Sequence, residues 1–229
     1  MKTAILVDGG FFLKRFKRLY GPDVSSKETV EIMYKSLLKH LVQGQRDGHK
    51  LRSQLYRMFF YDCPPISKKL HHPLTDEAID LSKSKEADYR ITLHEELKKR
   101  RKVALRLGRL ADNHRWLFSD QKRFRKTLRG ELSVSELREV DFHYDIRQKG
   151  VDMRIGLDIA SIAFKKQVDQ IVLVAGDADF VPAAKLARRE GIDFVLDPMW
   201  HGISSDLHEH IDGLKTYFQK REAIKNPPP

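Results

Sequence analysis

The chain has 229 residues, enough to bury a full hydrophobic core in one large domain or two small ones. Apolar residues make up 41% and charged residues 33%, and no apolar run approaches the roughly 20 residues that cross a membrane. The single cysteine, Cys63, excludes an internal disulfide and a thiolate zinc cluster. The first residues lack the long apolar stretch and cleavage site of a signal peptide, so we expect a cytoplasmic protein without membrane contacts.

Positive charge is concentrated in the middle of the chain. The sequence holds 43 Lys and Arg against 32 Asp and Glu, a net charge of +11. Between Lys98 and Arg129, 13 basic residues accompany only Asp112 and Asp120, so this segment carries the whole surplus. A localised surplus indicates a polyanionic partner, whereas the alternative is a solvated face that keeps the protein soluble.

The first part of the chain predicts two strands separated by two helices. The expected elements are a strand over 2–7, a basic helix over 11–20, a helix over 25–44 and a strand over 51–61. Gly9 and Gly10 permit a tight turn after the first strand, which ends at Asp8. This order predicts a right-handed crossover and a parallel sheet.

Residues 66–140 follow a looser pattern, with a polar helix predicted around 87–101 and a strand at 103–107. The basic segment contains Trp116, Phe118 and Phe124, which could stack on unpaired bases or, as aromatic residues do more often, form a local core. No linker of Gly, Ser or Pro flanks this region. We therefore expect one domain over 1–225, with 66–140 as a basic elaboration, and a disordered tail at 226–229.

The last third predicts a regular alternation of strands and helices. The expected elements are a strand at 141–146, a helix opening near Asp152, a strand at 171–175, a helix over 180–189, a strand at 192–196 and a closing helix that starts at Ser204 and ends before Lys225. The four branched residues at 171–174 predict a strand buried on both faces of the sheet.

Four carboxylates stand at equivalent places in this pattern. Asp8 ends the first strand, Asp177 and Asp179 follow the strand at 171–175, and Asp152 opens the helix before that strand. Because the carboxyl ends of parallel strands lie at one edge of a sheet, the four should converge. Two like charges about 4 Å apart repel by roughly 4 kcal/mol, so the cluster requires protonation or a cation. Ligands that are all oxygen suit Mg²⁺ or Mn²⁺.

Other polar residues receive structural interpretations. Asp179 could act only as an N-cap for its helix. Asp158 is expected to form structural hydrogen bonds, and Asp62 and Asp197 are expected to be turn residues ahead of proline-containing segments. The histidines at 71, 72, 201, 208 and 210 are assigned to surface or turn positions, because none has a second metal ligand at useful spacing.

The acidic blocks resemble a known family. Ile5–Asp8, Lys149–Asp152 and Ala175–Pro182 are similar to the three signature blocks of the NYN domain, a PIN-like nuclease family, and the likeness covers roughly 1–62 and 141–215. The resemblance implies a three-layer α/β/α sandwich around a mainly parallel, Rossmann-like sheet. It also implies a ribonuclease that depends on Mg²⁺ or Mn²⁺, with Asp8, Asp152, Asp177 and Asp179 as catalytic, metal-binding acids.

RNA, single-stranded or structured, is therefore the predicted partner, and a homo-oligomer is compatible with these features. The basic residues predicted to contact RNA are Lys14, Arg15, Arg106, Arg109, Lys122, Arg123, Arg125 and Lys149.

One position departs from the family pattern. Many relatives carry an Asn three residues after the first Asp, and Phe11 stands there in this chain. The first hypothesis is a metal-dependent RNA endonuclease, and this departure motivates the alternative of a catalytically weak or inactive RNA-binding or regulatory module. A phosphatase with a first-strand Asp nucleophile is disfavoured, because such enzymes need a second Asp where Gly10 stands.

Overall fold

The computed structural model describes residues 1–46 and 49–219, so the expected tail at 226–229 lies outside the described residues. Within the described residues, the central sheet has six strands in the order β12-β11-β10-β1-β4-β7, and all neighbours in it are parallel. The strands are β1 (Lys2–Asp8), β4 (Gln54–Asp62), β7 (Val103–Leu107), β10 (Gln170–Val174), β11 (Asp193–Asp197) and β12 (Gly213–Leu214).

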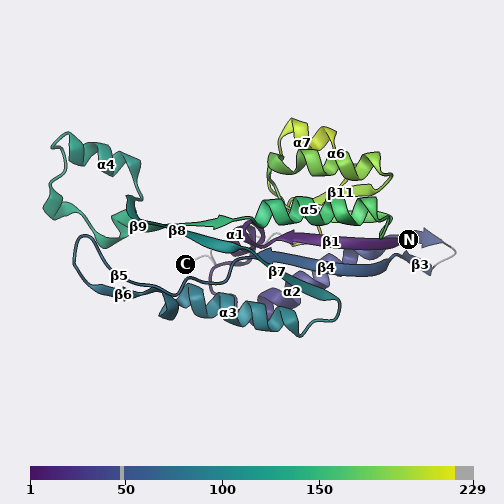
Figure 1. Cartoon of the computed structure of the whole chain (residues 1–229), viewed down its shortest axis with the longest axis horizontal. Coiled ribbons are helices and arrows are strands. Elements are labelled where there is room, and N and C mark those ends of the chain that lie inside the picture. The colour runs from purple at the N-terminus through teal and green to yellow at the C-terminus, as the bar shows by residue number, and fades with distance from the viewer. Residues whose placement is uncertain (47–48, 220–229) are drawn as a thin grey trace, which may run out of the picture.

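Helices cover both faces of this sheet (Figure 1). One face carries α1 (Gly9–Tyr20), α2 (Ser26–Leu38) and α3 (Lys85–Lys98), and the other carries α5 (Val151–Phe164), α6 (Val181–Arg189) and α7 (Ser205–Glu209). Alternate residues of each strand enter opposite cores: in β1, Ile5 and Val7 face α1 and α2, while Ala4 and Leu6 face α5. The expected three-layer α/β/α sandwich is confirmed. No helix of the described residues is long and apolar enough to span a membrane.

Two predicted helices are shorter than expected. The helix predicted to reach residue 44 ends at Leu38, because the chain turns through a short 3-10 helix (Lys39–Leu41) into the hairpin β2 (Val42–Arg46) and β3 (His49–Arg52). The predicted closing helix is wrong from 210 to 219, and the part of it after 219 lies outside the described residues. Asp212 binds Phe194 through both its backbone N–H and its carboxylate, which aligns the following residues as β12 at the sheet edge.

The region 66–140 divides between the sandwich and a projection. Strand β7 is the edge strand beside β4, and α3 packs on α2, where the hydroxyls of Tyr89 and Thr29 lie 2.8 Å apart. Strands β8 (Arg109–Phe118) and β9 (Phe142–Lys149) instead pair antiparallel, joined through α4 (Gln121–Leu128). We call residues 109–149 the arm. It extends away from the carboxyl edge of the sheet, with the hairpin of β5 (Lys69–His71) and β6 (Ala78–Asp80) beside it (Figure 1).

The aromatic residues of the arm pack against one another. The ring centroid of Phe118 lies 5.4 Å from Phe124 and 4.9 Å from Phe142, and Trp116 lies 5.5 Å from Tyr144. These contacts favour a local core over the alternative in which the rings stack on RNA bases, because each ring already has an aromatic neighbour.

The junction of β1 and α1 leaves no room for a side chain at Gly9. A Cβ there would lie 2.4 Å from the backbone oxygen of Tyr61 and 2.8 Å from the ring of Phe60. The turn that presents Asp8 therefore depends on the close approach of β4 to this glycine.

We expect Gly9→Ala to lower the free energy of unfolding by about 1–3 kcal/mol, the usual range for overpacking a core. Urea unfolding followed by circular dichroism measures the change. Gly156→Ala is the control: an added Cβ meets nothing within 4 Å, and alanine in a helix interior stabilises by about 0.5–1 kcal/mol. Equal stabilities of the two variants would show that the contacts of Gly9 leave room for a methyl group.

Candidate functional site

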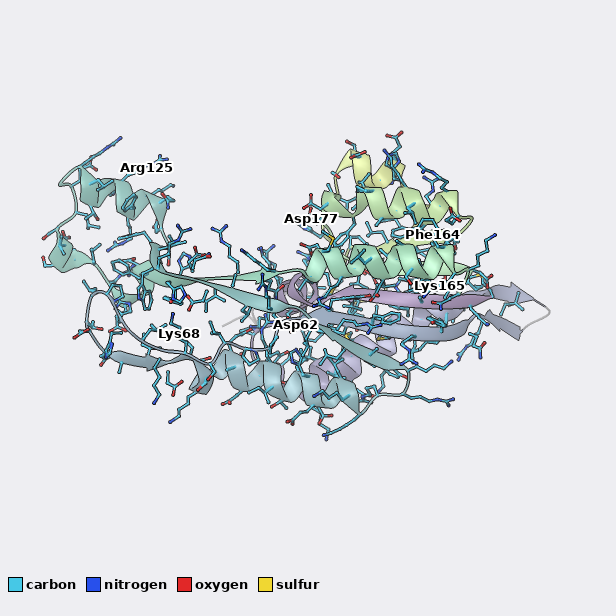
Figure 2. All side chains as sticks on the ribbon, in the orientation of Figure 1. Asp62, Lys68, Arg125, Phe164, Lys165 and Asp177 are labelled. Carbon is cyan, nitrogen blue, oxygen red and sulfur yellow. The ribbon has the colours of Figure 1, made fainter. Side chains whose placement is uncertain are left out.

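The four predicted acids lie at the carboxyl edge of the sheet. Strands β1 and β10 are parallel neighbours, so Asp8 and the loop bearing Asp177 and Asp179 leave the sheet side by side. Strand β9 delivers the first turn of α5, and with it Asp152, to the same edge. Asp8 is partly buried, whereas the other three are exposed. Figure 2 shows Asp177 at the end of the helical layer nearest the arm.

The four carboxylates form one set of interacting negative charges. Burial, with a smaller contribution from the charge of Asp152, raises the pKa of Asp8 to about 6, against the backbone N–H groups of Phe11 and Gly10 that lower it. Burial also raises the pKa of Asp152, with added repulsion from Asp177 and Asp179. Among the described residues, no Lys, Arg or His forms an ion pair with any of the four acids.

This donor set fits a hard divalent cation. All donors are carboxylate oxygens, and a cation would remove the repulsion that raises the pKa of Asp8 and Asp152. The four are not drawn into a closed cage in the part of the chain that the structure describes. An open set of carboxylates suits Mg²⁺ or Mn²⁺, because such ions keep several water ligands and bind through one or two carboxylates.

A compact group of three side chains that can bind a metal lies elsewhere, on α7 and the residue that follows it. Atoms of Asp206, Glu209 and His210 lie within 4.8 Å of one another, and His210 pairs with Asp206 at 3.5 Å. The expectation that His210 has no neighbouring ligand is therefore wrong. His72, assigned to a surface or turn, is buried and lies 5.0 Å from the Trp116 ring.

Asp62 is a fifth carboxylate at this edge. The prediction that it is a turn residue does not account for the contacts that it makes. It is fully buried at the end of β4, where Arg90 donates a hydrogen bond to it, His94 Nε2 lies 2.9 Å away and Gln148 Nε2 donates at 3.1 Å. Burial alone would raise the pKa of Asp62, but the hydrogen bond of His94 and the charge of Arg90 lower it below its ordinary value. Asp62 therefore stays negative and adds to the field that raises the pKa of Asp8.

Phe11 packs through its side chain against the loop that carries Asp177. Its backbone N–H donates to Asp8 Oδ1 at 3.2 Å, and its ring centroid lies 5.9 Å from that of His201. A Cβ at Gly176 would lie 2.5 Å from the Phe11 ring. The apolar side chain that replaces the family's Asn thus supports the loop by packing.

The alternative in which Asp179 only caps its helix is wrong. Asp177 Oδ1 accepts the backbone N–H of Asp179 at 3.1 Å and caps a short 3-10 turn (Ala178–Phe180). Helix α6 begins after Phe180 without a side-chain cap, so the carboxylate of Asp179 is available to a ligand.

Other acids behave as structural groups. Asp158 accepts the hydroxyl of Tyr61 at 2.8 Å, as expected of a structural hydrogen-bonding residue. Asp197 accepts the backbone N–H of Met199 at 2.9 Å, which fits the predicted turn, and its carboxylate also lies 2.9 Å from buried His40.

The residues predicted to contact RNA fall into two groups. Five are exposed and, among the described residues, form no ion pair: Lys14 on α1, and Arg109, Lys122, Arg125 and Lys149 on the arm. Figure 2 shows Arg125 at the far end of the arm. Three are held by other groups of the protein, which makes them structural: Arg15 by the Met199 carbonyl, Arg106 by Asp158 and Arg123 by Asp141.

Comparison with known proteins gives one family match. Residues 78–210, more than half of the chain, match the family described as NYN domain; the range includes Asp152, Asp177 and Asp179, and Asp8 precedes it. No curated protein matches the chain. A crystal structure of a protein of unknown function from Vibrio parahaemolyticus is 16% identical, over 93% of this chain and 90% of that one, with a TM-score of 0.45.

The raised pKa of Asp8 predicts the pH dependence of stability without metal. The unfolded carboxyl titrates near 3.9 and the folded one near 6, so stability falls as pH rises from about 4 to 6. Asp8→Asn removes this titration and keeps a good helix cap. We expect it to raise the free energy of unfolding by up to about 2–3 kcal/mol at pH 7.5 in EDTA, and by little at pH 3.5.

Urea unfolding at several pH values measures this difference. A gain from Asp8→Asn that is the same at pH 3.5 and 7.5 would show that the carboxyl does not titrate abnormally. The control is the same substitution at Asp23, an exposed acid outside the cluster.

Proposed function

We propose that this chain, which belongs to the NYN domain family, is a metal-dependent ribonuclease that hydrolyses internal phosphodiester bonds of RNA. The NYN domain is a ribonuclease-type domain. The observation that carries the finer proposal is the set of four carboxylates at the carboxyl edge of the sheet, in which Asp152 interacts with the charges of the other three and which lacks a cationic partner among the described residues.

Asp8, Asp152, Asp177 and Asp179 would hold the ion. A bound Mg²⁺ or Mn²⁺ polarises the phosphoryl group and lowers the pKa of bound water. The protein supplies the orientation: the backbone N–H groups of Phe11 and Gly10 fix the carboxylate of Asp8. A carboxylate that does not contact the ion can orient the attacking water and accept its proton.

The arm supports RNA as the substrate. Its strand β9 ends at Lys149, three residues before Asp152, so exposed cations continue from the arm to the acids. Cations free of ion pairs can exchange counterions for phosphates, which makes binding dependent on salt. The exposed edge, where three of the four acids face solvent, does not require a free RNA end and therefore favours endonucleolytic cleavage.

Phe11 motivates the alternative function. It supplies no polar side chain beside Asp8 and instead packs on Gly176 and His201. An RNA-binding module without turnover would retain the basic arm and the fold. Such a module would bind RNA in a salt-sensitive manner and leave it intact.

We expect Asp177→Asn to lower the rate of RNA cleavage by at least about 100-fold, because an amide replaces a charged ligand. Labelled RNA is incubated with each protein in Mn²⁺, Mg²⁺ or EDTA. Cleavage by the wild type that survives EDTA, or equal cleavage by both proteins, overturns the proposal. Intact RNA under every condition selects the inactive module.

The arm predicts a second, separable effect. We expect the double variant Lys122→Ala/Lys126→Ala to weaken binding of single-stranded RNA and to reduce the slope of log affinity against log salt by roughly 1.4, about 0.7 for each lost phosphate contact. Fluorescence anisotropy across a salt series measures both quantities. The matched control is Lys98→Ala/Lys165→Ala, two exposed lysines at the opposite edge of the sheet. An unchanged slope in the arm variant would assign its charge to solubility.

A further inference from the structure

A groove of about 380 Å³ runs between α5 and α6 beside the acids. Its walls are apolar, formed by Met153, Leu157, Pro182 and Leu186, and its polar lining comes from Asp152 and Asp179. Asp152 stands in the first turn of α5 and Asp179 just before α6, so they lie at the end of the groove nearest the sheet edge. The groove is thus continuous with the candidate metal site.

The apolar walls are left open to solvent. Met153 is 68% exposed and Leu157 is 61% exposed, although α5 buries Ile155, Ile159 and Ile162 in the core. Phe164, on the same helix and 62% exposed, lies at the opposite end of α5 from Asp177 and outside the groove (Figure 2). Exposed apolar side chains that line a cavity mark a binding surface more strongly than scattered ones do.

Gly156 keeps the groove open. It lies in the interior of α5, where glycine is less favourable than alanine, and an added Cβ would meet nothing within 4 Å. The packing of the protein therefore does not demand glycine at this position. Its missing side chain instead enlarges the space between Met153 and Leu157 on one wall and α6 on the other.

The charges of the groove select its occupant. Its lining contains two carboxylates and no Lys, Arg or His. Beyond the two acids its walls are apolar and offer a phosphate no cationic partner, whereas a flat, neutral, apolar group would be accepted. We propose that the groove holds an unpaired nucleobase of the RNA substrate, that of a nucleotide next to the phosphate held at the acids. This proposal rests on the proposed function of that site.

The contacts fit an aromatic ring. The thioether of Met153 and the side chains of Leu157, Pro182 and Leu186 offer polarisable and aliphatic surface to the face of a base. A base can enter only when it is unstacked from its neighbours. The substrate class is therefore single-stranded RNA or an unpaired loop, and the interior of an RNA duplex is excluded from this site.

The test compares intact RNA with RNA that lacks one base. A single abasic nucleotide is placed at each position around the cleaved bond of a single-stranded oligoribonucleotide. We expect the wild type to lose about tenfold in kcat/KM at one position next to that bond, the order that a stacked base contributes. Gly156→Leu, which fills the groove, should cleave intact and abasic RNA at the same lowered rate.

Leu157→Ser tests the same contact by removing apolar surface at an exposed position, where misfolding is not expected. Its matched control is Phe164→Ser, which alters an equally exposed residue of α5 outside the groove and should keep the wild-type preference. The proposal is overturned if Leu157→Ser keeps the tenfold preference, or if the wild type cleaves every abasic RNA as well as intact RNA.

Two further outcomes separate this proposal from its premise. If the wild type cleaves no RNA, the proposed function fails, and the groove is tested by the fluorescence of 2-aminopurine in bound RNA. A signal change at one position that Leu157→Ser abolishes supports the groove, and no change at any position overturns it. If Gly156→Leu instead alters the oligomeric state and leaves base preference intact, the groove is an interface between protein chains and the proposal is wrong.

Discussion

Like-charge repulsion at the carboxyl edge of the sheet is the constraint to which the other features of the site respond. Five carboxylates gather there, and among the described residues Asp62 alone has cationic partners. Asp62 is buried with Arg90 and His94, while Asp8, Asp152, Asp177 and Asp179 repel one another without an ion pair among the described residues. Because uncompensated charge costs a fold stability, the difference separates the acid that holds structure together from the four that we propose as metal ligands.

The positive charges of the arm divide in the same way, into those that bind an acidic side chain and those that do not among the described residues. On the arm, Arg115 and Arg147 bind Asp145, and Arg123 binds Asp141, so these cations stabilise the hairpin. Lys122 and Arg125 project from α4 without such partners among the described residues. The net charge therefore overstates the number of cations that are free to bind RNA phosphates.

Much of the sandwich could be predicted because its signals are local. Continuous apolar runs specify β1 and β10, and the register of parallel strands then brings Asp8 and Asp177 to one edge. The hairpin of the arm could not be predicted, because its pairing joins Arg109 to Lys149, 40 positions later in the sequence, across a segment of weak pattern. The charge of Asp62 is compensated by Arg90 and His94, which lie 28 and 32 positions away in the sequence, and no spacing rule predicts such contacts.

The direct passage of the arm into α5 has a mechanical consequence. Strand β9 has eight residues, which at about 3.4 Å each span roughly 27 Å. Gly150 alone separates this strand from α5, and its φ of 77° belongs to the left-handed region that glycine adopts most readily. The arm is therefore joined through one glycine to the helix that carries Asp152, and the extended strand β9 sets the distance between α4 and that helix. Under the proposed function, a strand of RNA bound to α4 would meet the acids at a distance set by β9, so the length of β9 would define a minimum footprint for the polymer.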